Sequence, residues 1–165
     1  VGYNAESWFW ARARRLVRVH KPEVDVLLAY ADPMCRRDLH GTIVLPGHVG
    51  TIYQATNARY MGRSSARTLY LDAHGRCISG RALTKISAQE SGQHYARARL
   101  EDASCTRQRA GESPRAWIKR ARAQLRRLRH PGNHVYIWGI DAGVDLPTSD
   151  LDYPRQPDPE QLGLL

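Results

Sequence analysis

A short, nearly continuous apolar run at residues 24–30 (VDVLLAY) sets the strongest limit on how this chain can fold. The run is far shorter than the ~20 apolar residues of a membrane span, and its pattern is that of a strand buried on both faces. Residues 5–20 precede it with apolar positions near helical spacing, and Pro22 separates the two elements. A helix followed by a buried strand predicts a mixed α/β fold, with Asp32 just past the end of the strand.

Alternation and turn residues predict further short elements downstream: a strand at 42–45, a short helix over 47–56, a strand over 58–62, a hairpin over 68–78 and a last strand over 135–138. Residues 84–112 are polar without clear alternation, which predicts an irregular or weakly helical insert. Ser113 followed by proline is a good cap and first-turn pair for a helix reaching about Arg129. With 42% hydrophobic residues, the chain has enough apolar material for one domain, which we expect over 1–140.

Charge is distributed unevenly along the chain. Residues 1–140 hold 24 Lys and Arg against 10 Asp and Glu, whereas residues 141–165 hold one Arg against six acids. A surplus of this size favours a polyanionic partner through phosphate contacts and counterion release. The candidate DNA contacts lie on the helix predicted after Ser113, and the alternative for them is a solvated basic face: Arg115, Lys119, Arg122 and Arg126. The acidic, proline-containing segment 141–165 predicts a disordered tail.

Other features of the composition favour a cytoplasmic protein. No apolar run is long enough for a membrane span, and no export signal opens the sequence. The three cysteines are odd in number and widely spaced, which predicts reduced thiols. The sequence begins at Val1 and opens on a helix with no strand before it, so we expect an N-terminal segment to be missing. Nothing in the sequence predicts an oligomeric state.

Three residues are candidates for catalysis from their placement. Asp32, at the end of a buried strand, can accept a proton or bind a metal, and its alternative is a turn-capping role. His48, at the start of the helix predicted over 47–56, can present a neutral imidazole as base or ligand. Tyr53 follows a little over one helical turn later and can reach the same cleft. The alternatives are that His48 is an ordinary surface residue and that Tyr53 is a residue of the core.

The first helix offers a candidate anion site. Its opening residues Gly2, Asn4 and Ala5 carry free backbone N–H groups that can hold a cofactor phosphate. Ser7 begins the same helix, next to the strand that carries Asp32. Four side chains have oxygen or nitrogen donors that suit iron or another divalent ion, although no H-x-x-x-H pair lies on a predicted helix: Asp32, His40, His48 and His134. Asp32 and His48 are the metal ligands we predict.

Five sequence segments together resemble the Mom family of phage DNA-adenine modification proteins, and they occur in the family's order. They are ESWF at 6–9, YADP at 30–33, GHVGTIYQATN at 47–57, YMG at 60–62 and PGNHVY at 131–136. The resemblance implies a branch of the acetyltransferase-like (GNAT) fold, a mixed sheet flanked by helices, here lacking its N-terminal strands. One departure is the stretch 34–46, which separates Asp32 from His48 more widely than is usual in the family.

The resemblance also implies an activity. Members act on adenine in double-stranded DNA and convert its N6 amino group to a carbamoylmethyl (acetamido)-type adduct, which protects phage or prophage DNA from restriction in the bacterial host. Acetyl-CoA and iron are the cofactors implied, and Ser7 and Asp32 match the family's active-site serine and aspartate. Two alternatives stay open: a GNAT-like N-acyltransferase acting on a protein or small-molecule amine, and a non-catalytic DNA-binding remnant.

Overall fold

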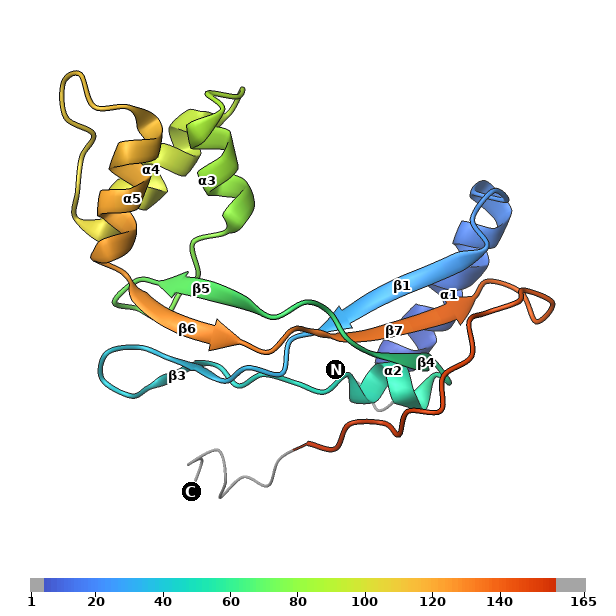
Figure 1. The fold of residues 1–165 in the computed structure, drawn as a ribbon. Helices are drawn as coiled ribbons and strands as arrows, with labels where there is room; N and C mark the ends of the chain where they lie inside the picture. The colour runs from blue at the N-terminus through green and yellow to red at the C-terminus, as the bar shows by residue number, and fades with distance from the viewer. Residues whose placement is uncertain (1–4, 157–165) are drawn as a thin grey trace. The chain divides into compact units, whose positions relative to one another are not determined.

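The computed structural model describes residues 5–156, which form two compact units (Figure 1). Unit 1 comprises residues 5–33, 47–65 and 131–156 of the described chain, and unit 2 comprises residues 34–46 and 66–130. The predicted single domain over residues 1–140 includes residues of both units. Whether the two units act as one domain stays a prediction. No helix in the described range is long and apolar enough to cross a membrane.

Unit 1 is built on a three-stranded antiparallel sheet with β7 in its centre. Its elements are α1 (Ala5–His20), β1 (Val26–Ala31), α2 (Thr51–Ala55), β4 (Arg59–Arg63) and β7 (His134–Gly139). The strand order is β1-β7-β4, and α1 packs on β7 through Trp10, whose ring lies 4.6 Å from that of Trp138. The predicted helix 5–20 and the predicted strands at 58–62 and 135–138 are thereby confirmed, with ends that differ by one residue.

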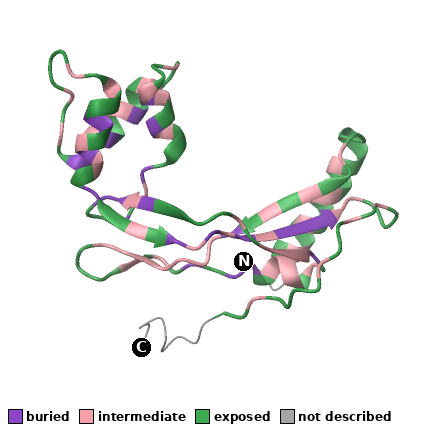
Figure 2. Ribbon diagram, viewed as in Figure 1, coloured by how far each residue is buried: buried purple, intermediate pink, exposed green. Residues whose placement is uncertain are grey.

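Strand β1 is not buried on both faces, contrary to the prediction from its apolar run. Its side chains alternate, and Val26, Leu28 and Tyr30 are 40%, 54% and 50% exposed (Figure 2). Leu27 and Ala29, on the other face, pack against the core around Trp138. The reason is topological: β1 pairs antiparallel with β7, and such sheets are commonly covered on one face only.

Unit 2 joins three helices to two antiparallel strand pairs. Its elements are β2 (Arg36–Arg37), β3 (Ile43–Leu45), β5 (Arg67–Leu71), α3 (Gly80–Ser87), α4 (Gln93–Ser104), α5 (Pro114–Ala123) and β6 (Arg126–His130). Strand β2 pairs with β3, and β5 pairs with β6. The three helices enclose one core, in which Ile86, Leu100 and Trp117 are fully buried.

Two predictions for unit 2 are wrong. The polar stretch 84–112 contains helix α4, because Ala96 and Leu100, one turn apart, supply enough buried surface once α3 and α5 cover them. The helix beginning after Ser113 ends at Ala123 rather than near Arg129, because residues 126–130 pair with β5. Arg126 therefore lies on a strand and not on the basic helix.

The predicted hairpin over 68–78 forms only in part. Gly75 makes the expected turn at φ +74°, and Leu71 and Cys77 form a bridge across it. The full-length partner of β5 is β6 instead, with Leu69 opposite Leu128. The strand predicted at 42–45 is present as β3.

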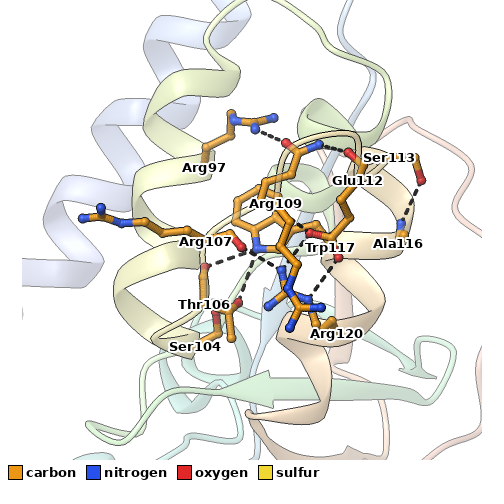
Figure 3. Close-up of polar contacts among 11 residues, drawn as sticks. Arg97, Ser104, Thr106, Arg107, Arg109, Glu112, Ser113, Ala116, Trp117 and Arg120 are labelled. Carbon is orange, nitrogen blue, oxygen red and sulfur yellow. Dashed lines mark hydrogen bonds and ion pairs between the residues drawn. The ribbon is translucent and has the colours of Figure 1, made fainter.

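A polar network fixes the start of α5 (Figure 3). The Ser113 hydroxyl accepts a hydrogen bond from the Ala116 N–H, as its capping role predicts. Arg120 donates to the Glu112 carboxylate through Nε at 3.0 Å and Nη2 at 2.7 Å. The backbone N–H of Arg109 donates to the same carboxylate. These hydrogen bonds, chiefly that from Arg120, lower the pKa of Glu112 to about 2.

Residues 141–156 have no helix or strand, and side chains of unit 1 make hydrogen bonds with them. The disordered tail predicted over 141–165 stays a prediction. The Arg59 guanidinium donates to the carbonyls of Leu146 and Pro147, and the Tyr153 hydroxyl donates to the Ala58 carbonyl at 2.6 Å. A backbone outside helices and strands leaves carbonyls such as those of Leu146 and Pro147 free to accept hydrogen bonds. Residues 157–165 lie outside the described range.

Glu112→Gln should lower the melting temperature at pH 7, because the variant lacks the charge-assisted bonds to Arg120. Since the folded-state pKa lies below the usual 4.5, this stabilisation is present above pH 4.5 and disappears as the pH falls towards 2. Thermal melts followed by circular dichroism between pH 7 and pH 2 check this. Glu101→Gln is the control, because the Glu101 carboxylate has only a 4.0 Å contact with exposed Arg107. A loss at pH 7 no larger than that of the control would contradict the prediction.

Candidate active site

The predicted catalytic residues Asp32 and His48 lie together in unit 1. Ala31, the last residue of β1, pairs with His134, the first residue of β7, and Asp32 follows immediately. The backbone N–H of His48 donates to the Asp32 carbonyl at 2.8 Å, so the chain returns to the strand end after the long stretch 34–46. The unusual sequence separation therefore leaves the two residues adjacent.

The loop that carries His48 is fixed on β7 by a close backbone approach. Gly50 has φ +80°, and a Cβ there would lie 2.7 Å from a Tyr53 ring atom and 2.8 Å from a Tyr136 ring atom. The Tyr136 hydroxyl donates to the Val49 carbonyl and accepts a hydrogen bond from the Gln54 side chain at 3.1 Å. Only glycine allows this contact, because any side chain would meet both rings.

His48 is not part of a helix, contrary to the placement predicted for it. Helix α2 begins at Thr51, and Gly50 is its cap residue. His48 lies in the preceding loop with an exposed side chain, and its ring centroid is 6.4 Å from that of Tyr53. The imidazole thus has access to solvent and to the aromatic side chain predicted to share its cleft.

The structure brings two further residues to this cluster: Tyr60 and His134, a nitrogen donor already noted in the sequence. The Nδ1 atom of His134 and the Tyr60 hydroxyl are 2.8 Å apart, and the His134 side chain is almost fully buried. Burial lowers the pKa of His134, and the nearby charges of Arg63 and His48 lower it further. Its imidazole is therefore neutral near pH 7, and a hydroxyl is within reach of one ring nitrogen.

Aromatic rings form the covered face behind these groups. The Tyr53 ring lies 5.4 Å from that of Tyr136 and 5.5 Å from that of Trp138, and Tyr60 lies 5.3 Å from Tyr136. Tyr136 and Trp138 are buried, while Tyr53 and Tyr60 are half-buried. The polar groups therefore border a dry aromatic wall, which strengthens electrostatic interactions at its edge.

The remaining candidate residues lie at or before the start of α1, and the structure describes only some of them. Ser7 is half-buried on α1, one turn before Trp10 on the same side of the helix, and its catalytic role stays a prediction. Ala5 is the first residue of α1, whereas Gly2 and Asn4 lie outside the described residues. The proposed phosphate site at the helix start therefore stays a prediction.

The metal prediction also stays open. Asp32 and His48 have donor atoms that suit iron, and buried His134 is a second nitrogen donor near His48. Across residues 5–156, however, no three His, Cys, Asp or Glu side chains gather as a metal-binding group. We therefore derive no chemical step through a metal.

Sequence reasoning had a usable signal for His134. In the segment HVYIWG, residues 134, 136 and 138 share one face of β7, and all three are buried. A histidine at the inward position of an otherwise aromatic face is a buried titratable group, and such groups cluster at functional sites. Tyr60 gave no comparable signal, because its contact with His134 depends on pairing of β4 with β7.

The fold and cluster together define a mixed α/β protein with a candidate proton-transfer site on the covered face of a small antiparallel sheet. The family model of the Mom protein family matches residues 1–155, and the chain belongs to that family. This membership is consistent with a role in phage DNA modification. No curated protein and no solved structure matches the chain.

Gly50→Ala should destabilise the protein by about 1–3 kcal/mol through overpacking, in addition to ~1 kcal/mol for the left-handed backbone. Gly41→Ala is the matched control, because Gly41 has φ +83° with nothing within 4 Å of its would-be Cβ. Urea unfolding of the two variants and the wild type gives the difference. Equal destabilisation by both substitutions would show that the contact with Tyr53 and Tyr136 is unimportant.

The His134 Cε1 proton should titrate below the ordinary pKa of 6.5, and Arg63→Gln should move that pKa upward by removing a nearby positive charge. Because the folded-state pKa is lowered, the protein should also lose stability as the pH falls below 6.5, where the unfolded chain takes up the proton first. Proton NMR across pH 4–8 measures the His134 pKa in the wild type and in the Arg63→Gln variant. Arg18→Gln, which removes a charge on α1, should leave the His134 pKa unchanged.

Proposed function

We propose that this protein modifies DNA, converting adenine N6 to a carbamoylmethyl (acetamido)-type adduct that shields phage or prophage DNA from restriction. Family membership supports the class of activity. The observation that carries the proposal is the cluster of Asp32, His48, Tyr60 and His134 at one end of the β1-β7-β4 sheet, because it combines a neutral buried base with groups that exchange protons.

The reaction needs a base. Forming a carbon–nitrogen bond at N6 requires the amino group to lose a proton, and a general base near neutral pH assists this step. The lowered pKa of His134 keeps its imidazole unprotonated at neutral pH, and we assign it, with Asp32, to proton acceptance. N6 would bond to the methylene carbon of an activated carbamoylmethyl donor as the bond from that carbon to the donor's leaving group breaks, and Tyr53 or Tyr60 would protonate the departing group. Ser7 and His48 would orient the reacting groups.

The target base also needs access. An N6 group within a duplex must leave the helical stack before it can enter a pocket. A cavity of about 660 Å³ borders Val49 and Gln54 of unit 1 and residues 152–156, beside the loop that carries His48. Its volume is in the range of small-ligand sites and is sufficient for one nucleotide.

The implied cofactors remain part of the proposal only. Acetyl-CoA is activated at its carbonyl carbon and by itself would give an N6-acetyl amide with release of the CoA thiol, so the carbamoylmethyl adduct needs a donor activated at its methylene carbon. Iron would supply redox or Lewis-acid chemistry. We assign neither to particular atoms. DNA affinity is attributed to the basic side chains predicted for it, Arg115, Lys119 and Arg122 on α5 and Arg126 on β6.

Expression with plasmid DNA in cells, followed by mass spectrometry of digested nucleosides, tests the function. The wild type should yield an adenosine heavier by a carbamoylmethyl group, and His134→Gln and Asp32→Asn should reduce that yield by about 10²-fold or more, the usual contribution of a general base. His94→Gln, an exposed substitution on α4, is the control and should retain the full yield.

Unmodified adenine from soluble wild-type protein would refute the proposal. Salt-dependent DNA binding that Asp32→Asn leaves unchanged, with no modified base, would identify a non-catalytic DNA-binding protein. Transfer of an acyl group to a protein or small-molecule amine, without DNA modification, would identify an N-acyltransferase instead.

A further inference from the structure

Three of the basic side chains to which DNA affinity was attributed line a pocket of about 480 Å³ in unit 2. Helices α3 and α5 and strands β5 and β6 form its walls. Its cationic lining residues are Arg115, Lys119, Arg122 and Arg127. Leu83 and Ile118 line its apolar part. We call this cavity the basic pocket.

The charges of the basic pocket are uncompensated. Among the residues that the structure describes, its four cations form no ion pair with an acid, and no Asp or Glu lines the cavity. Other arginines of unit 2 are neutralised by carboxylates, as in the pairs Arg81–Glu90 and Arg120–Glu112. The available acids are thus used elsewhere, and positive potential is concentrated in this cavity.

The cations are also arranged for a common ligand. Arg115, Lys119 and Arg122 follow one another at four- and three-residue intervals, which places them along one side of α5. The Arg122 guanidinium carbon lies 4.9 Å from the centroid of the Tyr70 ring, which holds that side chain over β5. Arg127 lies opposite Tyr70 on β6.

Arg122 carries a specific sign of a missing partner. Its Nε atom is buried and has no hydrogen-bond partner among the described residues. A buried donor without an acceptor is unfavourable, and a charged donor more so. An anion bound in the pocket would balance the surrounding charge.

We propose that the basic pocket binds a phosphate ester. Guanidinium groups match phosphate oxygens in a two-pronged geometry, and four cations exceed what one carboxylate would require. If the chain modifies DNA as proposed above, the ester is a phosphodiester of the DNA backbone, and this identification rests on that function. A free nucleotide carries the same group, and the experiment distinguishes the two sources.

Two binding measurements on the full chain test the proposal. Fluorescence anisotropy with a 20-base-pair duplex, at several salt concentrations, reports on backbone phosphate, and calorimetric titration with dAMP and with inorganic phosphate reports on free phosphate. Arg122→Gln and Lys119→Gln should each weaken the affinity about tenfold. For the duplex, each should also reduce the slope of log K against log salt by about 1.

Arg107→Gln is the matched control, because it removes the same charge from a side chain that is 91% exposed and lies outside the pocket. Lys119→Gln keeps the test valid if loss of the Arg122–Tyr70 contact unfolds unit 2. Weakened duplex binding without dAMP or phosphate binding identifies backbone phosphate. Weakened dAMP binding with an unchanged duplex affinity identifies a free nucleotide. Both support the pocket.

Affinities unchanged by either pocket substitution, or reduced equally by Arg107→Gln, would overturn the phosphate site. The nucleoside assay is scored separately. Modified adenine with pocket-independent binding would refute the pocket and leave the proposed function intact. Binding that depends on the pocket residues, without modified adenine, would support the pocket and refute the proposed function.

Discussion

The burial of Tyr136 on the central strand is the interaction on which the candidate site depends. Its ring occupies the space beside Gly50, and its hydroxyl binds the Val49 carbonyl, so it fixes the loop that brings His48 to the end of β1. Burial raises the pKa of the Tyr136 hydroxyl, which therefore stays a neutral hydrogen-bond donor. The loop position is thus set by a core residue rather than by contacts among the catalytic candidates themselves.

Alternate side chains of β7 point to the same face of the sheet, and this alternation connects the stability of the fold with the protonation of His134. His134, Tyr136 and Trp138 share one face, and the packing that stabilises the two aromatic residues also removes the imidazole from water. Burial is the largest cause that lowers the pKa of His134, and the positive charges of Arg63 and His48 lower it further. A substitution that loosens this face would therefore alter the protonation of the candidate base as well as the free energy of unfolding.

Arginine has two distinct roles in unit 2. Arg120 and Arg81 are bound by carboxylates and fix local structure, the first by joining Glu112 to helix α5. Arg115 and Arg122, on the same unit, retain unpaired positive charge in the basic pocket. Net charge alone cannot separate these roles, because it counts every arginine equally. The positions of a few acids decide which cations remain available to a polyanion.

The sequence by itself determined helix 5–20, most short strands, the Ser113 cap and the place of Asp32 at a strand end, because spacing, proline and capping act locally. The family resemblance pointed to Ser7 and Asp32 and the placement of His48 pointed to that residue, and their catalytic roles stay predictions. Only the tertiary structure decided that residues 126–130 form a strand, that β1 has an exposed face, and that Tyr60 meets buried His134. Strand pairing and burial join residues distant in sequence, and their energies outweigh local preference.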